Sequence, residues 1–274
     1  MSATTTLSPK AIIFDAYGTL FDVHSVVAAA EQIFPGRGDA LSQLWRQKQI
    51  EYTQLRTLAD AGEGAAHYRP FWDITLDALR FSAKKLQLTL GRTAEKRLMD
   101  EYACLSAFPD AVPALRLLRD GVSSSAATSA RPGLAILSNG NPQMLDVAVK
   151  SAGMSGLFDQ VLSVDAVRAY KPAPVAYALG TQAFGVEPRE IVFVSSNGWD
   201  VAGATWFGFT TFWLNRQNAP LEELGVTPHG VGGGMNDLLS FLQALASRSP
   251  LPAQASRQPR KPSGGNRKRA SPRA

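Results

Sequence analysis

The alternation of apolar and amphipathic stretches constrains the fold of this chain more than any other feature. Apart from one long interruption, short apolar runs alternate with stretches of helical periodicity. This alternation predicts an α/β fold, a doubly wound parallel (Rossmann-like) sheet with helices on both faces. The expected strands are 11–14, 134–137, 160–163, 191–194 and 211–214, and the expected helices between them are 111–120, 142–152, 174–184 and 201–207.

The interruption, residues 22–108, shows helical patterning throughout. An all-helical insertion after the first strand predicts a cap domain over the edge of the sheet, where it can exclude water and contact a substrate. The core domain then comprises residues 11–21 and 109–248. The helices expected in the cap are 26–33, 40–58, 71–86 and 93–105.

The ends of the chain differ in composition from the body. The net charge is +5, but residues 250–274 hold seven Lys or Arg and no acid, so the rest carries −2. We expect the basic tail, 249–274, and residues 1–10 to be disordered, since neither can bury enough apolar surface to fold. The tail is either a solvated extension, which we favour, or an attachment point for nucleic acid. A nucleic-acid partner is not expected, because no folded element is basic.

Three sequence features indicate the cellular compartment of the protein. No apolar run is long enough to span a bilayer, and the first residues lack the charged-then-apolar order of a secretory signal, so no membrane association is expected. Cys104 is the only cysteine, which excludes an internal disulfide and suits a reducing compartment. We expect a cytoplasmic protein.

Asp15 directly follows the first apolar run and precedes a glycine-containing turn. A carboxylate at the carboxyl end of a parallel strand is placed to act as a nucleophile or a metal ligand, although an aspartate here can also merely cap a turn. Two residues later stands Tyr17, where an acid would be the nearest proton donor to a leaving group. A halide leaves without a proton, whereas an alkoxide benefits from a general acid. The pair therefore favours carbon–halogen cleavage over phosphate monoester hydrolysis.

The segment 15–21, DAYGTLF, resembles motif I of the haloacid dehalogenase superfamily, and Tyr17 in place of the second aspartate resembles its (S)-2-haloacid dehalogenase branch. The resemblance runs from about residue 11 to about residue 228 and is carried further by FDVHSVV (21–27), WRQKQIEY (45–52), LSNG (137–140), YKP (170–172) and VSSNGWD (194–200). It implies hydrolysis of short L-2-haloalkanoates to D-2-hydroxyalkanoates with inversion, through an aspartyl ester on Asp15. It also implies a homodimer, and a 2-haloacid and a halide ion as the small-molecule partners. The catalytic residues it implies are Asp15, Thr19, Arg46, Lys171, Ser195, Asn197 and Asp200.

Residues of the expected cap acquire their roles from the resemblance. An exposed helical arginine is by itself usually solvated, but Arg46 lies in the WRQK segment and would receive the departing halide, where negative charge develops. By the same resemblance Gln47, Ile50 and Phe71 would join Tyr17 in a wall around the alkyl group and the halogen. Without it, Phe71 would be a core residue.

Polar residues also follow the second and third expected strands. Ser138 and Asn139 offer a hydroxyl, an amide and backbone N–H groups to a carboxylate, and Asn139 can contact the halide, although Ser-Asn-Gly is equally an ordinary turn. Lys171 matches the motif III lysine and would bind the substrate carboxylate and orient Asp15. Tyr177 would supply a supporting hydroxyl or simply pack on a helix face.

The fourth expected strand is followed by Ser195, Asn197, Trp199 and Asp200. Two aspartates are too few for a magnesium site, so we expect no metal and no cofactor. Asp200 would pair with Lys171 and, with Asn197, position the water that hydrolyses the ester, while Trp199 would line the pocket. The rival interpretation is a phosphatase or phosphonatase of the same superfamily, which predicts acids at position 17 and near position 197. The sequence has neither.

Overall fold

The computed structural model describes residues 9–60, 65–121 and 131–247 of the 274 in the chain. The predicted basic tail, 249–274, and most of the predicted N-terminal segment, 1–10, lie outside the described residues.

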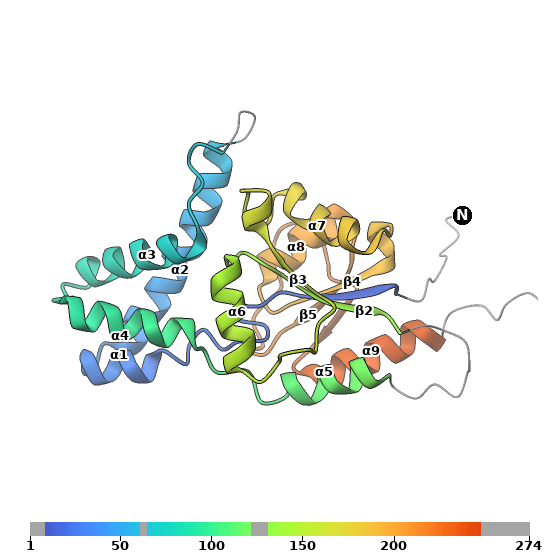
Figure 1. The fold of residues 1–274 in the computed structure, drawn as a ribbon, viewed down its shortest axis with the longest axis horizontal. Coiled ribbons are helices and arrows are strands. Elements are labelled where there is room, and N and C mark those ends of the chain that lie inside the picture. Colours follow the sequence, from blue (N-terminus) through green and yellow to red (C-terminus); the bar gives the residue numbers. More distant parts are fainter. Residues whose placement is uncertain (1–8, 61–64, 122–130, 248–274) are drawn as a thin grey trace, which may run out of the picture.

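A six-stranded sheet with every described pair of strands parallel forms the centre of the molecule (Figure 1). The strand order is β3-β2-β1-β4-β5-β6. The predicted doubly wound class is confirmed, and each of the five predicted strands is present to within one residue at each end. The strands are β1 (Ala11–Phe14), β2 (Gly133–Ser138), β3 (Gln160–Ser163), β4 (Ile191–Ser195), β5 (Thr210–Leu214) and β6 (Gly230–Gly232).

Strand β6 was not predicted, because its sequence, Gly-Val-Gly, is too short and too rich in glycine for an apolar run. The structure explains one of these glycines. A Cβ at Gly230 would lie 2.7 Å from the ring of Phe241 and 2.8 Å from that of Phe212. Only glycine at this position leaves room for the two aromatic rings that pack against the strand.

Helices cover both faces of the sheet, with α7 and α8 on one face and α5 and α9 on the other (Figure 1). Their order along the chain follows the predicted alternation, with α9 as an addition beyond the last predicted strand; Leu238 and Leu242 of this helix are buried. The helices of this part are α5 (Ala111–Asp120), α6 (Pro142–Ser151), α7 (Pro174–Phe184), α8 (Gly198–Phe207) and α9 (Met235–Ser247), with short 3-10 turns η1 (Val164–Ala166) and η2 (Pro188–Glu190).

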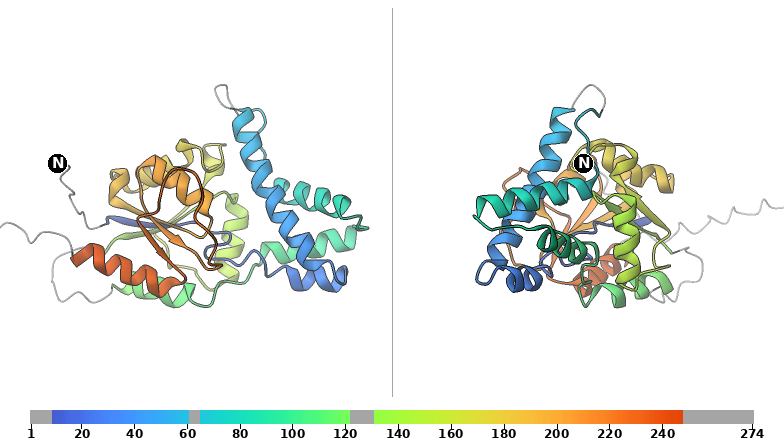
Figure 2. Two further views of the ribbon diagram at one scale, coloured as in Figure 1. Left: turned by 180° about the vertical axis from the view of Figure 1, so that it is seen from behind. Right: turned by 60° about the vertical axis from the view of Figure 1, so that its left-hand side comes forward.

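The remaining four helices lie together beside the sheet, facing the end where β1 finishes (Figures 1 and 2). Buried contacts join them, including the hydrogen bond of 2.7 Å that the Trp45 indole N–H donates to the Thr75 carbonyl. All four coincide with the predicted cap helices to within two residues, while their status as a separate domain stays a prediction. They are α1 (Val27–Ile33), α2 (Gly38–Ala59), α3 (Phe71–Lys85) and α4 (Arg92–Ala103).

The topology fixes where ligands bind. Strand β1 pairs with β2 on one side and β4 on the other, and the chain passes through β2 and β3 before it crosses to β4, so the strand order reverses at β1. The carboxyl end of such a central strand opens into the crevice where doubly wound folds bind their ligands. Asp15 is the first residue after β1, and the four cap helices face it.

Candidate active site

Asp15 is held rigidly at the end of β1. Its N–H donates to the Val194 carbonyl at 2.9 Å, which extends the sheet by one residue. One carboxylate oxygen, Oδ1, accepts from Lys171 Nζ at 2.8 Å. The other, Oδ2, accepts from Thr19 Oγ1 at 2.8 Å and from Asn197 Nδ2 at 2.9 Å. Three donors from three loops thus orient a carboxylate that is 5% exposed.

The Lys171 ammonium is fully engaged within the protein. Its three hydrogens meet three acceptors, namely Asp15 Oδ1 at 2.8 Å, Asp200 Oδ2 at 2.7 Å and the Leu137 carbonyl at 3.2 Å. Burial disfavours the charged form, but the two carboxylates outweigh it, and the net effect raises the pKa of Lys171. The lysine is therefore a cation with no hydrogen left for a substrate carboxylate. Of the two roles expected for it, this geometry serves the orientation of Asp15.

Asp200 lies behind Lys171 as seen from Asp15. It is completely buried, and its second oxygen, Oδ1, accepts from the Tyr177 hydroxyl at 2.7 Å. Burial raises the pKa of Asp200, while Lys171 and Tyr177 act in the opposite direction. Tyr177 therefore supports Asp200 with its hydroxyl, and it does not line the cavity beside Asp15.

The donor set does not suit a magnesium ion. An ammonium lies between the two carboxylates, at 2.8 Å from Asp15 and 2.7 Å from Asp200, where a divalent cation would need their free oxygens. Within the described ranges, no three His, Cys, Asp or Glu side chains form a group that could hold a metal.

Arg46 reaches from α2 toward Asp15. Its Nη2 donates to the Tyr17 carbonyl at 3.0 Å and to Asn197 Oδ1 at 3.2 Å, and its Nη1 donates to Gln49 Oε1 at 2.7 Å. Asn197 thus links the cap arginine to the Asp15 carboxylate through the two ends of one amide. A guanidinium and a carboxylate thus line the same small space.

That space is a cavity of about 10 Å³, enough for about one water molecule. A haloalkanoate is larger, so a lining side chain or the cap helices must move for it to enter. Nine of the predicted site residues line this cavity together with one that was not predicted, Thr53. The predicted ones are Asp15, Tyr17, Arg46, Ile50, Phe71, Ser138, Asn139, Asn197 and Trp199.

Close packing places Tyr17 in the cavity wall. Its ring centroid lies 5.6 Å from that of Phe71 and 5.9 Å from that of Tyr102. A Cβ at Gly140 would stand 2.7 Å from the Tyr17 ring, so only glycine leaves the ring its place. Burial, the largest cause, raises the pKa of Tyr17 far above its ordinary value. The phenol therefore stays neutral and is a poor proton donor to a leaving group.

Four predicted residues besides Tyr177 lie behind the cavity, and one lies outside it. Thr19 and Lys171 contact Asp15 directly, and Asp200 acts on it through Lys171. The Ser195 hydroxyl accepts from the Asn197 N–H at 3.1 Å, which fixes the turn that carries Asn197. Gln47, by contrast, is exposed and does not line the cavity. The structure does not bring it to the site it was predicted to join.

The helical period explains both the misplaced residue and the missed ones. A residue directly after Arg46 points about 100° away around the helix, whereas residues three, four and seven positions on share its face. Those positions are Gln49, Ile50 and Thr53, of which only Ile50 was predicted. Spacing from Arg46 was the available signal, and applying it would have selected Gln49 over Gln47.

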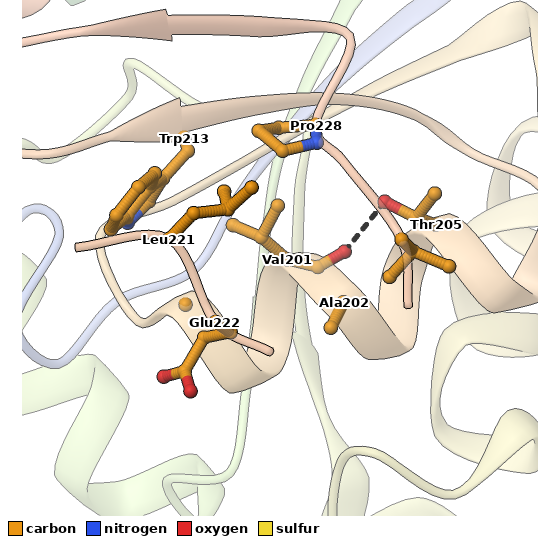
Figure 3. A pocket seen from close by; sticks show the side chains of 9 residues that line it. Val201, Ala202, Thr205, Trp213, Leu221, Glu222 and Pro228 are labelled. Carbon is orange, nitrogen blue, oxygen red and sulfur yellow. Dashed lines mark hydrogen bonds between the residues drawn. The ribbon is translucent and has the colours of Figure 1, made fainter. Parts of the chain in front are cut away.

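A second small pocket lies between α8, Trp213 of β5 and the loop 221–228 (Figure 3). The side chains of Val201, Leu221 and Pro228 make it mainly apolar. No predicted site residue lines it. One of its lining residues supports the active site, because the Trp213 indole N–H donates to the carbonyl of Ser196, the neighbour of Asn197, at 3.2 Å.

The fold and the buried Asp15–Lys171–Asp200 arrangement define a hydrolase of the haloacid dehalogenase-like class. The model of that hydrolase family matches residues 9–208. Within the class the chain belongs to the (S)-2-haloacid dehalogenases. It is 47% identical to the (S)-2-haloacid dehalogenase of Pseudomonas sp. (strain YL) over 241 residues, which cover 88% of this chain and 97% of the relative.

Solved structures of the same group share the fold. One L-2-haloacid dehalogenase is 62% identical, with a TM-score of 0.81 over 86% of this chain and all of the other. The enzyme of Xanthobacter autotrophicus with chloropropionic acid covalently bound is 38% identical, with a TM-score of 0.75 over 86% of this chain and 98% of the other. The family predicted from the sequence is confirmed.

Proposed function

We propose that this protein hydrolyses short-chain L-2-haloalkanoates to D-2-hydroxyalkanoates, with inversion at C2, through an ester on Asp15. The observation that carries the proposal is that Asp15 and Arg46 line one cavity. A carboxylate fixed by three donors is a nucleophile with little freedom to lose on attack. The guanidinium in the same cavity supplies a cation for the charge that gathers on a departing anion.

In the first step an Asp15 oxygen attacks C2 from the side opposite the halogen. The C2–oxygen bond forms as the carbon–halogen bond breaks, and the halide leaves with the electron pair, toward Arg46 and Asn139. The departing halide needs no proton, so the step does not require Tyr17 to act as an acid. Lys171 keeps Asp15 aligned, and Ser138 with neighbouring backbone N–H groups receives the substrate carboxylate. Ile50, Phe71 and Trp199 enclose the alkyl group.

In the second step water adds to the carbonyl carbon of the Asp15 ester. Asn197, whose amide contacts both Asp15 and Arg46, positions that water from within the cavity wall. Asp200 does not line the cavity. It acts on this step through Lys171, whose ammonium it holds beside Asp15. The bond between the ester carbonyl carbon and the oxygen on C2 then breaks. One proton of the water ends on that oxygen, which becomes the hydroxyl of the 2-hydroxy acid, and the other is released to solvent as Asp15 returns to a carboxylate.

The phosphatase alternative is less compatible with these contacts. It needs a proton donor near the leaving oxygen and a cation between the acids. Tyr17 is a buried neutral phenol, and the ammonium of Lys171 lies between Asp15 and Asp200.

Halide release from L- and D-2-chloropropionate tests the proposal, with EDTA present and with para-nitrophenyl phosphate plus magnesium as the parallel assay. Chloride from the L-form alone, unaffected by EDTA, is the expected result. Cleavage of the phosphate ester without chloride release would replace the proposal by the phosphatase function.

We further propose a cytoplasmic homodimer that docks through the cap. Within the described ranges, no helix combines the length and the apolarity that crossing a bilayer requires.

The dimer contact is proposed on three large apolar side chains of the cap that remain exposed. Leu55 and Leu58 on α2 and Phe81 on α3 are exposed by 53%, 72% and 37%. Light scattering is expected to give the mass of a dimer for the wild type and of a monomer for Leu58→Glu. A wild-type monomer would refute the proposal.

A further inference from the structure

Gln49 is the most completely buried amide near the site, with no exposed surface. It lies on α2, three residues after Arg46 and so on the same face of the helix. Its Oε1 accepts from Arg46 Nη1 at 2.7 Å and from the Tyr102 hydroxyl at 3.0 Å. Its Nε2 donates to Thr75 Oγ1 at 2.6 Å. No atom of Gln49 lines the cavity, so it does not touch the reacting groups.

The neighbours of Gln49 determine which way its amide faces. The Thr75 hydroxyl donates its single hydrogen to the Phe71 carbonyl at 2.7 Å, so its oxygen can only accept from Gln49. The amide N–H must therefore face Thr75, which turns the carbonyl oxygen toward Arg46. The network fixes an acceptor behind the guanidinium and ties it to the start of α3, where Phe71 lines the cavity.

The two ends of the guanidinium are thus held by different parts of the molecule. Core groups, the Tyr17 carbonyl and the Asn197 amide, accept from Nη2, and Gln49 of the cap accepts from Nη1. Because Gln49 is neutral, it restrains Arg46 without cancelling its charge. A glutamate in this place would bond as well but would neutralise the cation that a departing anion needs.

We propose that Gln49 is a positioning residue that holds the Arg46 guanidinium where the halide departs. The proposal rests on the proposed dehalogenase function. Its consequence is a specific dependence on the leaving group. Chloride is a poorer leaving group than bromide, so its departure depends more on a correctly placed cation. Loss of Gln49 therefore slows the chloride reaction more than the bromide reaction.

The test compares Gln49→Met with Gln43→Met, which changes an exposed glutamine six residues earlier on the solvent-facing side of the same helix. The measured quantity is kcat/KM for L-2-chloropropionate and L-2-bromopropionate, which reports the steps up to ester formation. For Gln49→Met we expect a fall of roughly 10- to 100-fold with the chloro substrate, as for other supporting hydrogen bonds, and a smaller fall with the bromo substrate. Gln43→Met should match the wild type with both.

Two further measurements separate positioning from a structural effect. Lower stability reduces the active fraction and so lowers both rates by the same factor, which leaves the bromo/chloro ratio unchanged. In an Arg46→Lys background, which removes Nη1, Gln49→Met should no longer shift that ratio. If Gln49→Met does not fold, Thr75→Val, which frees the Gln49 amide, should shift the ratio in the same direction.

An unchanged bromo/chloro ratio in folded Gln49→Met or Thr75→Val would overturn the positioning role, as would an undiminished shift in the Arg46→Lys background. A wild type that releases neither halide would instead refute the proposed function. The two failures are therefore distinguishable.

Discussion

Removing the Lys171 ammonium gives the most demanding test of the site's electrostatics. In Lys171→Met a side chain of similar length keeps the packing, but Asp15 and Asp200 lose the cation that contacts both at 2.8 and 2.7 Å. Their side chains are 7% and 0% exposed, so water cannot replace the lost contact. Breaking a buried ion pair by removing one partner costs about 3–5 kcal/mol. We expect a loss of that size in the free energy of unfolding near neutral pH.

The loss should depend on pH, with a definite sign. Without the cation, the buried Asp200 carboxylate favours its protonated form, so the pKa of Asp200 in the folded variant rises above the unfolded value. The folded variant then binds more protons than its unfolded chain, and its stability falls as pH rises through the window between the two pKa values. The fall is about 1.4 kcal/mol per pH unit for one carboxylate. The variant should therefore approach the wild type as the pH is lowered.

Urea unfolding of Lys171→Met and of the wild type, at about pH 5 and about pH 8, measures this difference. The matched control is Lys150→Met, which removes a lysine that is 67% exposed and pairs with Asp146 on the helix surface. This control should lie within about 0.5 kcal/mol of the wild type at both pH values. A loss for Lys171→Met below about 1 kcal/mol, or one that is equal at both pH values, would refute the picture of one ammonium shared by two buried carboxylates.

Two other predictions follow from the site. Asp15→Asn should abolish halide release while the variant keeps the wild-type circular dichroism spectrum, and measurable turnover would show that another group attacks C2. Because burial raises the pKa of Asp200 above its ordinary 3.8, the acid limb of the pH dependence of kcat should have its midpoint above 3.8. Tyr177→Phe removes a hydrogen bond to the carboxylate and should move that midpoint to higher pH; an unmoved or lower midpoint would argue against Asp200 as the titrating group.

Most of the fold, and the meeting of the site's loops at one edge of the sheet, follow from local sequence. Five strands and eight helices were predictable because apolar periodicity depends on the residues of each segment alone. The convergence of Asp15, Ser138 and Asn197 was predictable as well, since residues that follow parallel strands meet at one edge of the sheet. The nature of the leaving group was indicated by the single residue Tyr17.

Tertiary packing decided the rest. Helical spacing puts Gln49 and not Gln47 on the face of Arg46, but only the packing of α2 against its neighbours makes that face buried and leaves Gln47 exposed. Lys171 matched a motif, but its engagement depends on acceptors from three other segments, which leave it no hydrogen for a substrate. A sequence determines where helices and strands form because those are local preferences. The number of hydrogen bonds that a buried group makes depends on residues far apart in the chain, so only the folded molecule determines it.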